Sequence, residues 1–242
     1  MSRKLTVWIF PTILALTTGL IIMAQDITPD SDAARMAALQ TRLAALEKKI
    51  GLLEDSKAVK RLQRAYGYYV DKGLSHEVSG LFSDQATVEL AGLGVYVGKE
   101  HITALYRRLL GDRPADGQLN NHIIMQGVVH VAPDGLSAKG RWRALIQTGQ
   151  HGVSALWAEG PFENEYIKED GVWKISKLHW YNTLTAPYDP GWHKAPRPMA
   201  GQLTDLPPDL SPTVEYQSFP AAFLPPYHYA NPVTGSADEV VQ

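Results

Sequence analysis

Four long stretches in the second half of the chain constrain its fold most strongly. Each is rich in residues that favour strands, and each is separated from the next by a short turn containing Gly, and in one case Pro, which bend the chain at low cost. Strands joined by such short turns run antiparallel, because a parallel neighbour needs a long crossover. The sequence therefore predicts an antiparallel meander, with strands at residues 120–132, 136–148, 153–168 and 172–181.

Helical patterns and a hairpin precede this meander. Val59, Leu62, Tyr66 and Tyr69 recur at helical spacing, and that helix is predicted to end near Gly73. A short segment at residues 76–82 follows. Two short strands flanking a glycine turn form a predicted hairpin, and a further helix comes before the meander; they occupy residues 86–90, 95–97 and 98–110. Helices followed by a strongly curved antiparallel sheet indicate an α+β fold with the helices on one face.

The N-terminus resembles an export signal. Arg3 and Lys4 precede an apolar run at residues 5–22, and Ala24 suits the residue before a cleavage point. We expect residues 1–24 to be a signal peptide and the protein to be periplasmic or secreted. The alternative is an uncleaved membrane anchor, because the run nearly reaches the ~20 residues that a span requires.

A heptad pattern follows in residues 25–55. Apolar residues alternate at intervals of three and four, with leucine at every d position: Met36, Leu39, Leu43, Leu46, Ile50 and Leu53. Arg42 and Lys49 fall at g positions, and Glu47 and Glu54 at e positions, where they would pair across two parallel copies. The pattern favours a homodimer or homotrimer, and the alternative is a helix that packs on its own domain.

Residues 182–242 form a third kind of segment. They hold eleven of the 16 prolines, so they cannot be regular throughout. They also carry many aromatic residues, which predicts an extended arm lying on this subunit or on a neighbour. Residues 56–181 are left as the globular domain.

Charge and composition exclude several classes of function. The formal net charge is −2 with scattered basic residues, so no surface for nucleic acid is indicated. The chain has no cysteine, no HExxH motif and no glycine-rich nucleotide-binding motif. We therefore expect neither a metal nor another cofactor.

Several motifs occur in an order that resembles the nuclear transport factor 2-like superfamily, in particular its SnoaL-like and scytalone dehydratase-like branches. A tyrosine-rich helix ends in Asp71 directly before a hairpin, and Asn121-His122-Ile123-Ile124 begins the first long strand. The motif GPFENEY at residues 160–166 is followed by DGVWKI at 170–175. The resemblance covers about residues 58–181. It implies a cone-shaped α+β barrel that often performs acid/base chemistry without a cofactor.

The resemblance also places three catalytic residues: Asp71 at the helix end, His122 on the strand, and Tyr69 as an auxiliary proton donor. An Asp–His pair suits proton transfer, because the carboxylate fixes one tautomer while the other imidazole nitrogen exchanges a proton near neutral pH. Thr148 stands where the family has a second strand histidine, which argues against dehydration of the scytalone type. The alternatives are an exposed carboxylate at Asp71 and a histidine that only caps the sheet edge.

An aromatic pocket lining is expected from the same domain. If their side chains point inward, the following residues would bind a flat substrate: Tyr66, Trp142, Trp157, Phe162, Asn164, His179 and Tyr181. Asn164 would donate a hydrogen bond to a developing oxyanion. The alternative is that the aromatic residues form an ordinary core.

Together these features predict an exported, cofactor-independent lyase of the dehydratase or formaldehyde-releasing type. Its expected substrate is a small apolar, aromatic alcohol, for example a lignin-derived one. The alternatives are an isomerase or polyketide cyclase, and a non-catalytic ligand-binding or oligomerisation module of the same fold.

Overall fold

The computed structural model describes residues 29–111 and 113–236, and the predicted export signal lies outside them. The chain divides into two units between Leu46 and Glu47. No helix in the described part of the chain is long and apolar enough to cross a membrane. In chain order the elements are α1 (Pro29–Asp71), α2 (Ser75–Gly80), β1 (Phe82–Leu90), the 3-10 turn η1 (Ala91–Leu93), β2 (Val95–Val97), α3 (Lys99–Leu110), β3 (Gln118–Val131), β4 (Ser137–Gln150), β5 (Ser154–Glu169), β6 (Val172–Trp180), β7 (Leu184–Pro187) and α4 (Gly191–Lys194).

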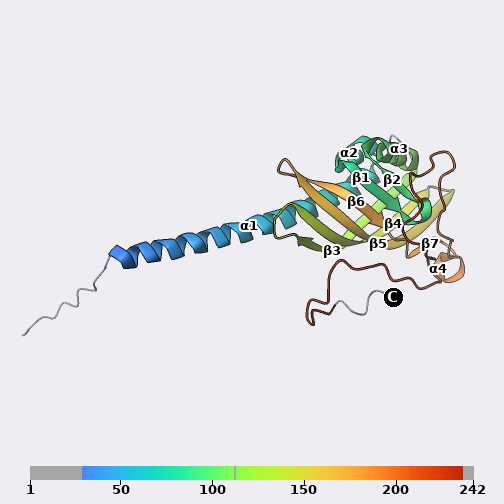
Figure 1. The fold of residues 1–242 in the computed structure, drawn as a ribbon. Helices are drawn as coiled ribbons and strands as arrows, with labels where there is room; N and C mark the ends of the chain where they lie inside the picture. Colours follow the sequence, from blue (N-terminus) through green and yellow to red (C-terminus); the bar gives the residue numbers. More distant parts are fainter. Residues whose placement is uncertain (1–28, 112, 237–242) are drawn as a thin grey trace, which may run out of the picture. The chain divides into compact units, whose positions relative to one another are not determined.

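The described strands form one curved, unclosed sheet in the order β2-β1-β6-β5-β4-β3, with β7 paired to β5 (Figure 1). The predicted meander is confirmed, because β3 to β6 pair antiparallel in sequence order. One pairing differs from the rest: β1 runs parallel to β6. The hairpin and α3 intervene between β1 and the meander, so the last meander strand returns beside β1 in the same direction.

The N-terminal helical region is one helix where the sequence suggested two. α1 spans 43 residues and contains proline only at its first position, Pro29, where proline is tolerated. Gly51 lies inside it, but a glycine costs a helix only about 1 kcal/mol and does not break it. The other predicted helix is confirmed as α3, between Gly98 and Gly111, which both have positive φ values.

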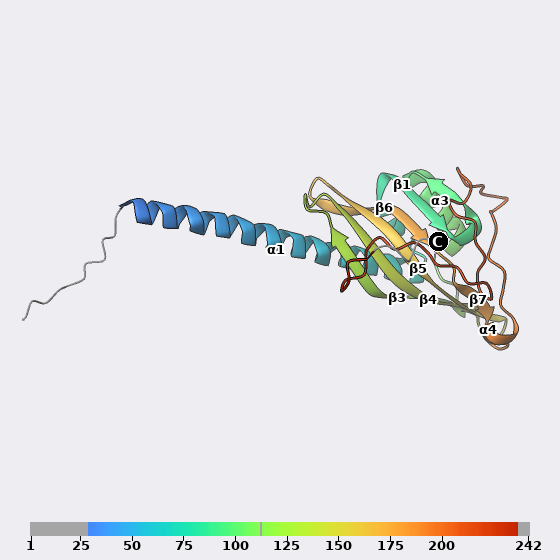
Figure 2. The ribbon, with the colours of Figure 1, turned by 60° about the horizontal axis from the view of Figure 1, so that its bottom comes forward.

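The core lies between the helices and one face of the sheet, which we call the inner face (Figures 1 and 2). Each large apolar side chain buried there contributes roughly 1.5–3 kcal/mol. The fully buried ones include Phe82, Tyr96, Ile102, Tyr106, Tyr166 and Leu178. α1 lies very close to β3 at Gly67, where a Cβ atom would come within 2.9 Å of Ile124 Cγ1.

The C-terminal arm is fastened to its own domain, along β2 and α3 and over part of the opposite, outer face of the sheet. Asp209 accepts hydrogen bonds from the Val97 N–H and from His101, both at 2.7 Å. Burial alone would raise the pKa of Asp209, but these hydrogen bonds hold that pKa below its ordinary value. Further attachments join Arg108 to Asp205, Tyr96 to Leu206, Glu89 to Thr213, Asn182 to Tyr216, Arg141 to Pro226 and Glu163 to His228.

Candidate active site

A cavity of about 430 Å³ opens between α1, α3 and the inner face of the sheet; we call it the cone cavity. Its walls are mainly aromatic and aliphatic, with Tyr66, Tyr106, Phe162, Trp180, Leu90 and Leu93 among them. Polar side chains lie at a few points, namely His122, Asn120, Thr148, Asn182, Thr185 and Arg197. Apolar walls with a few placed polar groups are typical of sites for small organic molecules.

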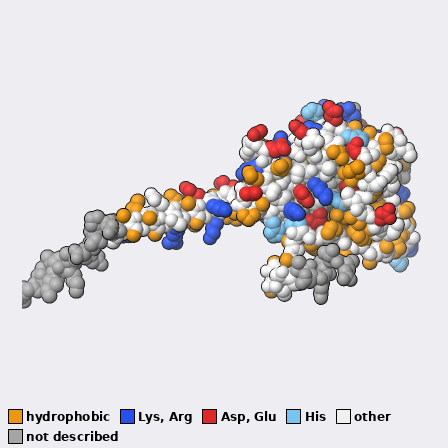
Figure 3. All heavy atoms as spheres, viewed as in Figure 1, with side chains coloured by type: hydrophobic (Ala, Val, Ile, Leu, Met, Phe, Trp, Pro, Cys, Tyr) orange, Lys and Arg blue, Asp and Glu red, His pale blue; other side chains and the backbone are white. Residues whose placement is uncertain are grey.

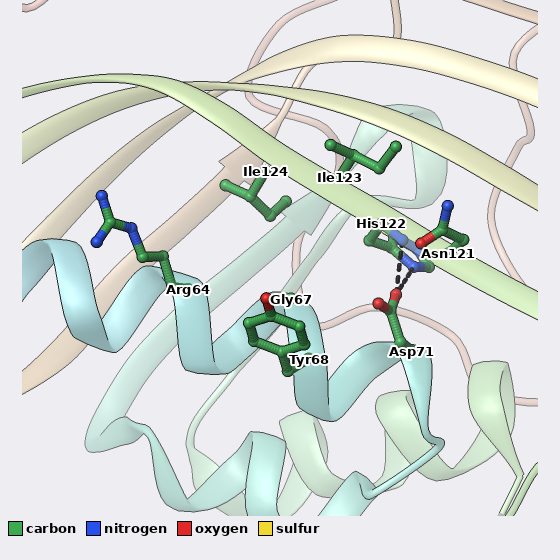
Figure 4. A pocket seen from close by; sticks show the side chains of 8 residues that line it. All are labelled: Arg64, Gly67, Tyr68, Asp71, Asn121, His122, Ile123 and Ile124. Carbon is green, nitrogen blue, oxygen red and sulfur yellow. Dashed lines mark hydrogen bonds and ion pairs between the residues drawn. The ribbon is translucent and has the colours of Figure 1, made fainter.

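Asp71 lies in contact with His122, a residue of this cavity wall, and Figure 4 shows the pair. Asp71 Oδ1 lies 3.1 Å from His122 Nδ1 and accepts a hydrogen bond of 2.6 Å from the His122 backbone N–H. Both side chains are largely buried, with 14% and 15% of their surface exposed. An ionised carboxylate only accepts hydrogen bonds, so Nδ1 carries the proton and Nε2 is left as the basic nitrogen.

The local fold explains why these groups converge. Asp71 is the last residue of α1, and the close contact at Gly67, one turn earlier, sets that end of the helix against β3. β3 is an edge strand of the described sheet, paired only with β4. The outward N–H of His122 therefore has no strand partner and is satisfied by the Asp71 carboxylate.

The pair lies between two spaces. His122 lines the cone cavity and also a separate groove of about 320 Å³ between α1 and β3, which Asp71 lines as well (Figure 4). Arg64, Tyr68 and Asn121 form other parts of that groove. The Asp71–His122 pair thus connects a surface groove with the apolar interior.

A pair of buried tyrosines provides further hydrogen-bonding groups. Tyr66 and Tyr106 lie 3.0 Å apart through their hydroxyl oxygens, and both line the cone cavity. Burial raises the pKa of both phenols above the ordinary value. They therefore remain neutral near pH 7 and act as hydrogen-bond donors rather than as bases.

Several predicted pocket residues lie elsewhere. Tyr66 and Phe162 line the cone cavity as expected, whereas Tyr69 is half-buried against the core and is absent from the described cavity walls. Trp142 and Asn164 face inward but belong to a buried hydrogen-bond network with Tyr166 and Gln63. The Asn164 amide nitrogen already donates to Gln63 at 3.0 Å and to the Tyr166 hydroxyl at 3.4 Å, so neither N–H is free to stabilise an oxyanion.

The remaining predicted lining residues belong to the outer face. Trp157 is five positions before Phe162, and successive residues of a strand point to opposite faces of the sheet. An odd separation therefore puts Trp157 on the face opposite Phe162, where it stacks on Tyr188 outside the cavity. His179 and Tyr181 stack on each other at 3.9 Å beneath the arm. Burial lowers the pKa of His179 to about 3, and its Nε2 has no hydrogen-bond partner among the described residues.

The structure also adds residues to the site that sequence reasoning missed. Asn120 is two positions before His122 on β3 and so shares its face of the strand, and Tyr106 is four positions after Ile102 and so shares its face of α3. The periodicity of the sequence could therefore have placed both residues at the site. Asn182 and Arg197 had none, because irregular chain after β6 brings them to the cavity, and Thr185 lies in β7, a short strand that the sequence did not predict. Among the described residues, no group of three or more His, Asp or Glu side chains is placed to hold a metal ion.

Comparison with known proteins agrees with this architecture. A family model described as the SnoaL-like domain matches residues 52–179, which is more than half of the chain. The chain belongs to the SnoaL-like domain family. As its motifs predict, this SnoaL-like protein is a member of the nuclear transport factor 2-like superfamily. No curated protein matches it.

Solved structures show the same fold at low identity. LinA shares 22% identity over 58% of this chain and 93% of that chain, with a TM-score of 0.51. The type 3 hexachlorocyclohexane dehydrochlorinase LinA of Novosphingobium barchaimii shares 22% over 57% and 93%, also at 0.51. A candidate scytalone dehydratase of Novosphingobium aromaticivorans shares 20% over 58% and 91%, at 0.50. At these identities the likeness concerns the fold alone.

Proposed function

We propose that this SnoaL-like protein is a cofactor-independent lyase in which His122 and Asp71 perform general acid/base catalysis on a small aromatic alcohol. The observation that carries the proposal is the contact between the Asp71 carboxylate and His122 Nδ1 at the wall of an apolar cavity. A carboxylate in this position holds the imidazole in one orientation and stabilises the imidazolium that forms when Nε2 takes a proton. LinA, one protein of the same fold, is named as a dehydrochlorinase.

Proton movement balances in both reactions that we consider. In a dehydration, His122 Nε2 takes a proton from carbon and the released electron pair forms the double bond. The imidazolium then gives that proton to the hydroxyl group, which leaves as water. In a formaldehyde release, Nε2 takes the hydroxyl proton, the C–C bond breaks, and the imidazolium returns the proton to the carbanion. In the Tyr66–Tyr106 pair one hydroxyl donates to the other, which leaves one O–H to donate a hydrogen bond that orients the oxygen of the substrate.

The groove beside Asp71 gives the pair a connection to solvent. Asp71 and His122 both line it, so water there exchanges protons with the pair without entering the cone cavity. This separation suits a lyase, because protons can be exchanged in the groove while the substrate occupies the cone cavity.

The cavity supports an aromatic substrate. Its volume of about 430 Å³ lies within the common range for sites of small organic molecules. Phe162 and Trp180 offer flat apolar surfaces against which a ring can pack. A lignin-derived alcohol is one candidate for such a substrate, and an isomerase or cyclase reaction would use the same base.

The experiment compares three variants with the native protein on a panel of aromatic alcohols and dimers, following products by mass. His122→Ala should abolish turnover while ligand binding persists, and Asp71→Asn should reduce turnover by about 10²- to 10⁴-fold. His151→Ala is the matched control, because that histidine is exposed in the turn between β4 and β5. Turnover that survives in His122→Ala contradicts the proposal. Ligand binding without turnover by the native protein favours the non-catalytic alternative.

Export is part of the same proposal. The apolar run at residues 5–22 after Arg3 and Lys4 supports it. Fractionation of expressing cells together with the N-terminal mass of the protein tests it. Loss of residues 1–24 is expected, whereas a protein with an intact N-terminus in the membrane fraction indicates the anchor.

A further inference from the structure

One cationic side chain stands at the cone cavity without a counter-charge. Arg197 is the one Arg or Lys that lines it, and its lining, within the described residues, includes no Asp or Glu. Nor does the described structure give the Arg197 guanidinium an ion-pair partner. The cavity therefore favours a ligand that carries negative charge.

The fold fixes the position of Arg197. Its backbone N–H donates to the Thr185 carbonyl oxygen at 2.7 Å, which ties this part of the chain to β7. Pro196 and Pro198 flank it and restrict the backbone on both sides. Asn182 and Thr185 line the same cavity, hydrogen-bonded to each other at 3.1 Å, so uncharged polar groups accompany the guanidinium.

We infer that the cone cavity binds an aromatic compound carrying a carboxylate, and that Arg197 recognises this carboxylate. The inference rests on the proposed function only in taking the cone cavity as the substrate site. A guanidinium presents paired N–H donors that match the two oxygens of a carboxylate. Arg197 is exposed at the cavity, so it serves in binding and selection rather than in the proton transfer at His122.

Binding is measured with benzoate-type acids and their uncharged amides by calorimetry and by the tryptophan fluorescence of the protein, to which Trp180 in the cavity wall contributes. The native protein should bind the acid about 10-fold more tightly than the amide, and Arg197→Gln should remove this preference. Arg197→Lys should keep part of it. Lys194→Gln is the matched control, because it removes an equal charge from exposed α4, away from the cavity.

The outcomes separate the two proposals. Equal affinities of the native protein for acid and amide overturn the inference and leave the lyase proposal intact. A preference that Lys194→Gln reduces as much as Arg197→Gln also overturns it, because a long-range field would then be responsible. If neither compound competes with a turned-over substrate, the cone cavity does not select these acids and the inference fails, whereas the turnover leaves the lyase proposal standing.

A separate observation concerns the N-terminal part of α1. The six apolar residues of the heptad pattern, Met36, Leu39, Leu43, Leu46, Ile50 and Leu53, are 48–64% exposed. Figure 3 shows apolar side chains along α1. We call these six residues the apolar seam.

Charges flank the apolar seam in a complementary order. Arg42 and Lys49 lie at g positions and Glu47 and Glu54 at e positions, on opposite sides of the seam. They therefore cannot pair along one helix, and the described structure gives none of the four an ion pair. In a parallel pair of helices, each g residue faces the next e residue of the partner, so Arg42 meets Glu47 and Lys49 meets Glu54.

We propose that the apolar seam pairs with a second copy of this chain as a parallel, two-stranded coiled coil in register. Leucine at each d position favours two parallel strands, and Ile50 at an a position agrees. The complementary charges select the parallel direction, because an antiparallel pair would place g opposite g. Gly51 lies at a b position away from the seam and does not interrupt it.

The absence of native cysteine allows a direct test in the full chain. Leu46→Cys places a thiol at a d position, where the two copies face each other, whereas Lys48→Cys places it at the outward f position. Oxidation should link Leu46→Cys into a dimer at least 10-fold faster than Lys48→Cys. Equal rates, or no linked dimer from Leu46→Cys, overturn the proposal.

A charge exchange tests the direction independently of oxidation. Arg42→Glu should weaken the dimer in sedimentation experiments, and the double variant Arg42→Glu with Glu47→Arg should restore it, because only a parallel pair regains the attraction. A double variant no better than the single one overturns the parallel arrangement. A trimeric mass for the native protein overturns the two-stranded one.

Discussion

Substitution of alanine for each of two glycines in α1, Gly51 and Gly67, should change the free energy of unfolding in opposite directions. Gly67→Ala adds a methyl group where a Cβ atom would lie 2.9 Å from Ile124 Cγ1 and 3.4 Å from the His122 carbonyl oxygen. Gly51→Ala adds it where nothing lies within 4 Å. Alanine favours the helix by about 1 kcal/mol at both positions. At Gly67 this gain is opposed by an overpacking cost of about 1–3 kcal/mol, because α1 must move away from β3.

The expected free energy of unfolding therefore rises by up to about 1 kcal/mol in Gly51→Ala and falls by about 0–2 kcal/mol in Gly67→Ala. Denaturant unfolding followed by tryptophan fluorescence measures both. Gly67→Ala should also lower turnover, since the displaced helix end carries Asp71 away from His122. If Gly67→Ala is as stable as Gly51→Ala and keeps full activity, the close packing of α1 on β3 does not position the pair.

Three further predictions concern other parts of the structure. The pKa of His179 is about 3 in the folded protein and about 6.5 in the unfolded protein, so the unfolded state takes up the proton first as the pH falls. Stability should therefore decrease as the pH drops from 6.5 toward 3, and His179→Gln should make the measured stability less dependent on pH between 6.5 and 4.5. Asp209→Ala should weaken the attachment of the arm by about 1 kcal/mol, measured as faster limited proteolysis near that residue, and equal proteolysis of the variant and the native protein contradicts this prediction. Because the pKa of Asp209 is lowered in the folded protein, the same weakening is expected in the native protein as the pH falls below 4. Tyr66→Phe should lower turnover about 10-fold with little change in ligand affinity, and unchanged turnover removes the tyrosine pair from the mechanism.

Much of the sheet was predictable because strands and turns are local features. The first meander strand was expected at residues 120–132 and lies at Gln118–Val131, and the last was expected at 172–181 and lies at Val172–Trp180. Turn residues such as Gly135 and Gly171 have positive φ values, which glycine adopts more readily than other residues, so the glycines marked these turns in the sequence. The parallel pairing of β1 with β6 depends instead on how distant segments meet.

The contact between Asp71 and His122 was predictable, and the lining of the cavity was less so. Asp71 and His122 were brought together by a family resemblance, since 51 residues separate them and no local pattern links them. Trp157 was assigned to the wrong face of the sheet, although its odd separation from Phe162 on the same strand predicts that the two side chains point to opposite faces. His179 and Tyr181 were also misplaced, because they alternate with Trp180, which faces the cavity. Arg197 reaches the cavity from an irregular segment whose path has no periodicity.

The position of Asp71 suggests that the pair is maintained for chemistry at some cost to the fold. A carboxylate at the C-terminal end of a helix faces the negative end of the helix dipole, and the last turn of α1 holds no basic residue to offset it. Asp71→Asn removes that charge, and its amide oxygen can still accept the His122 backbone N–H. We therefore expect Asp71→Asn to match or exceed the native stability by up to about 1 kcal/mol while turnover falls, measured by denaturant unfolding and product mass on the same samples. A variant that loses both stability and activity would show that the carboxylate holds β3 in place, and the argument that it serves proton transfer would fail.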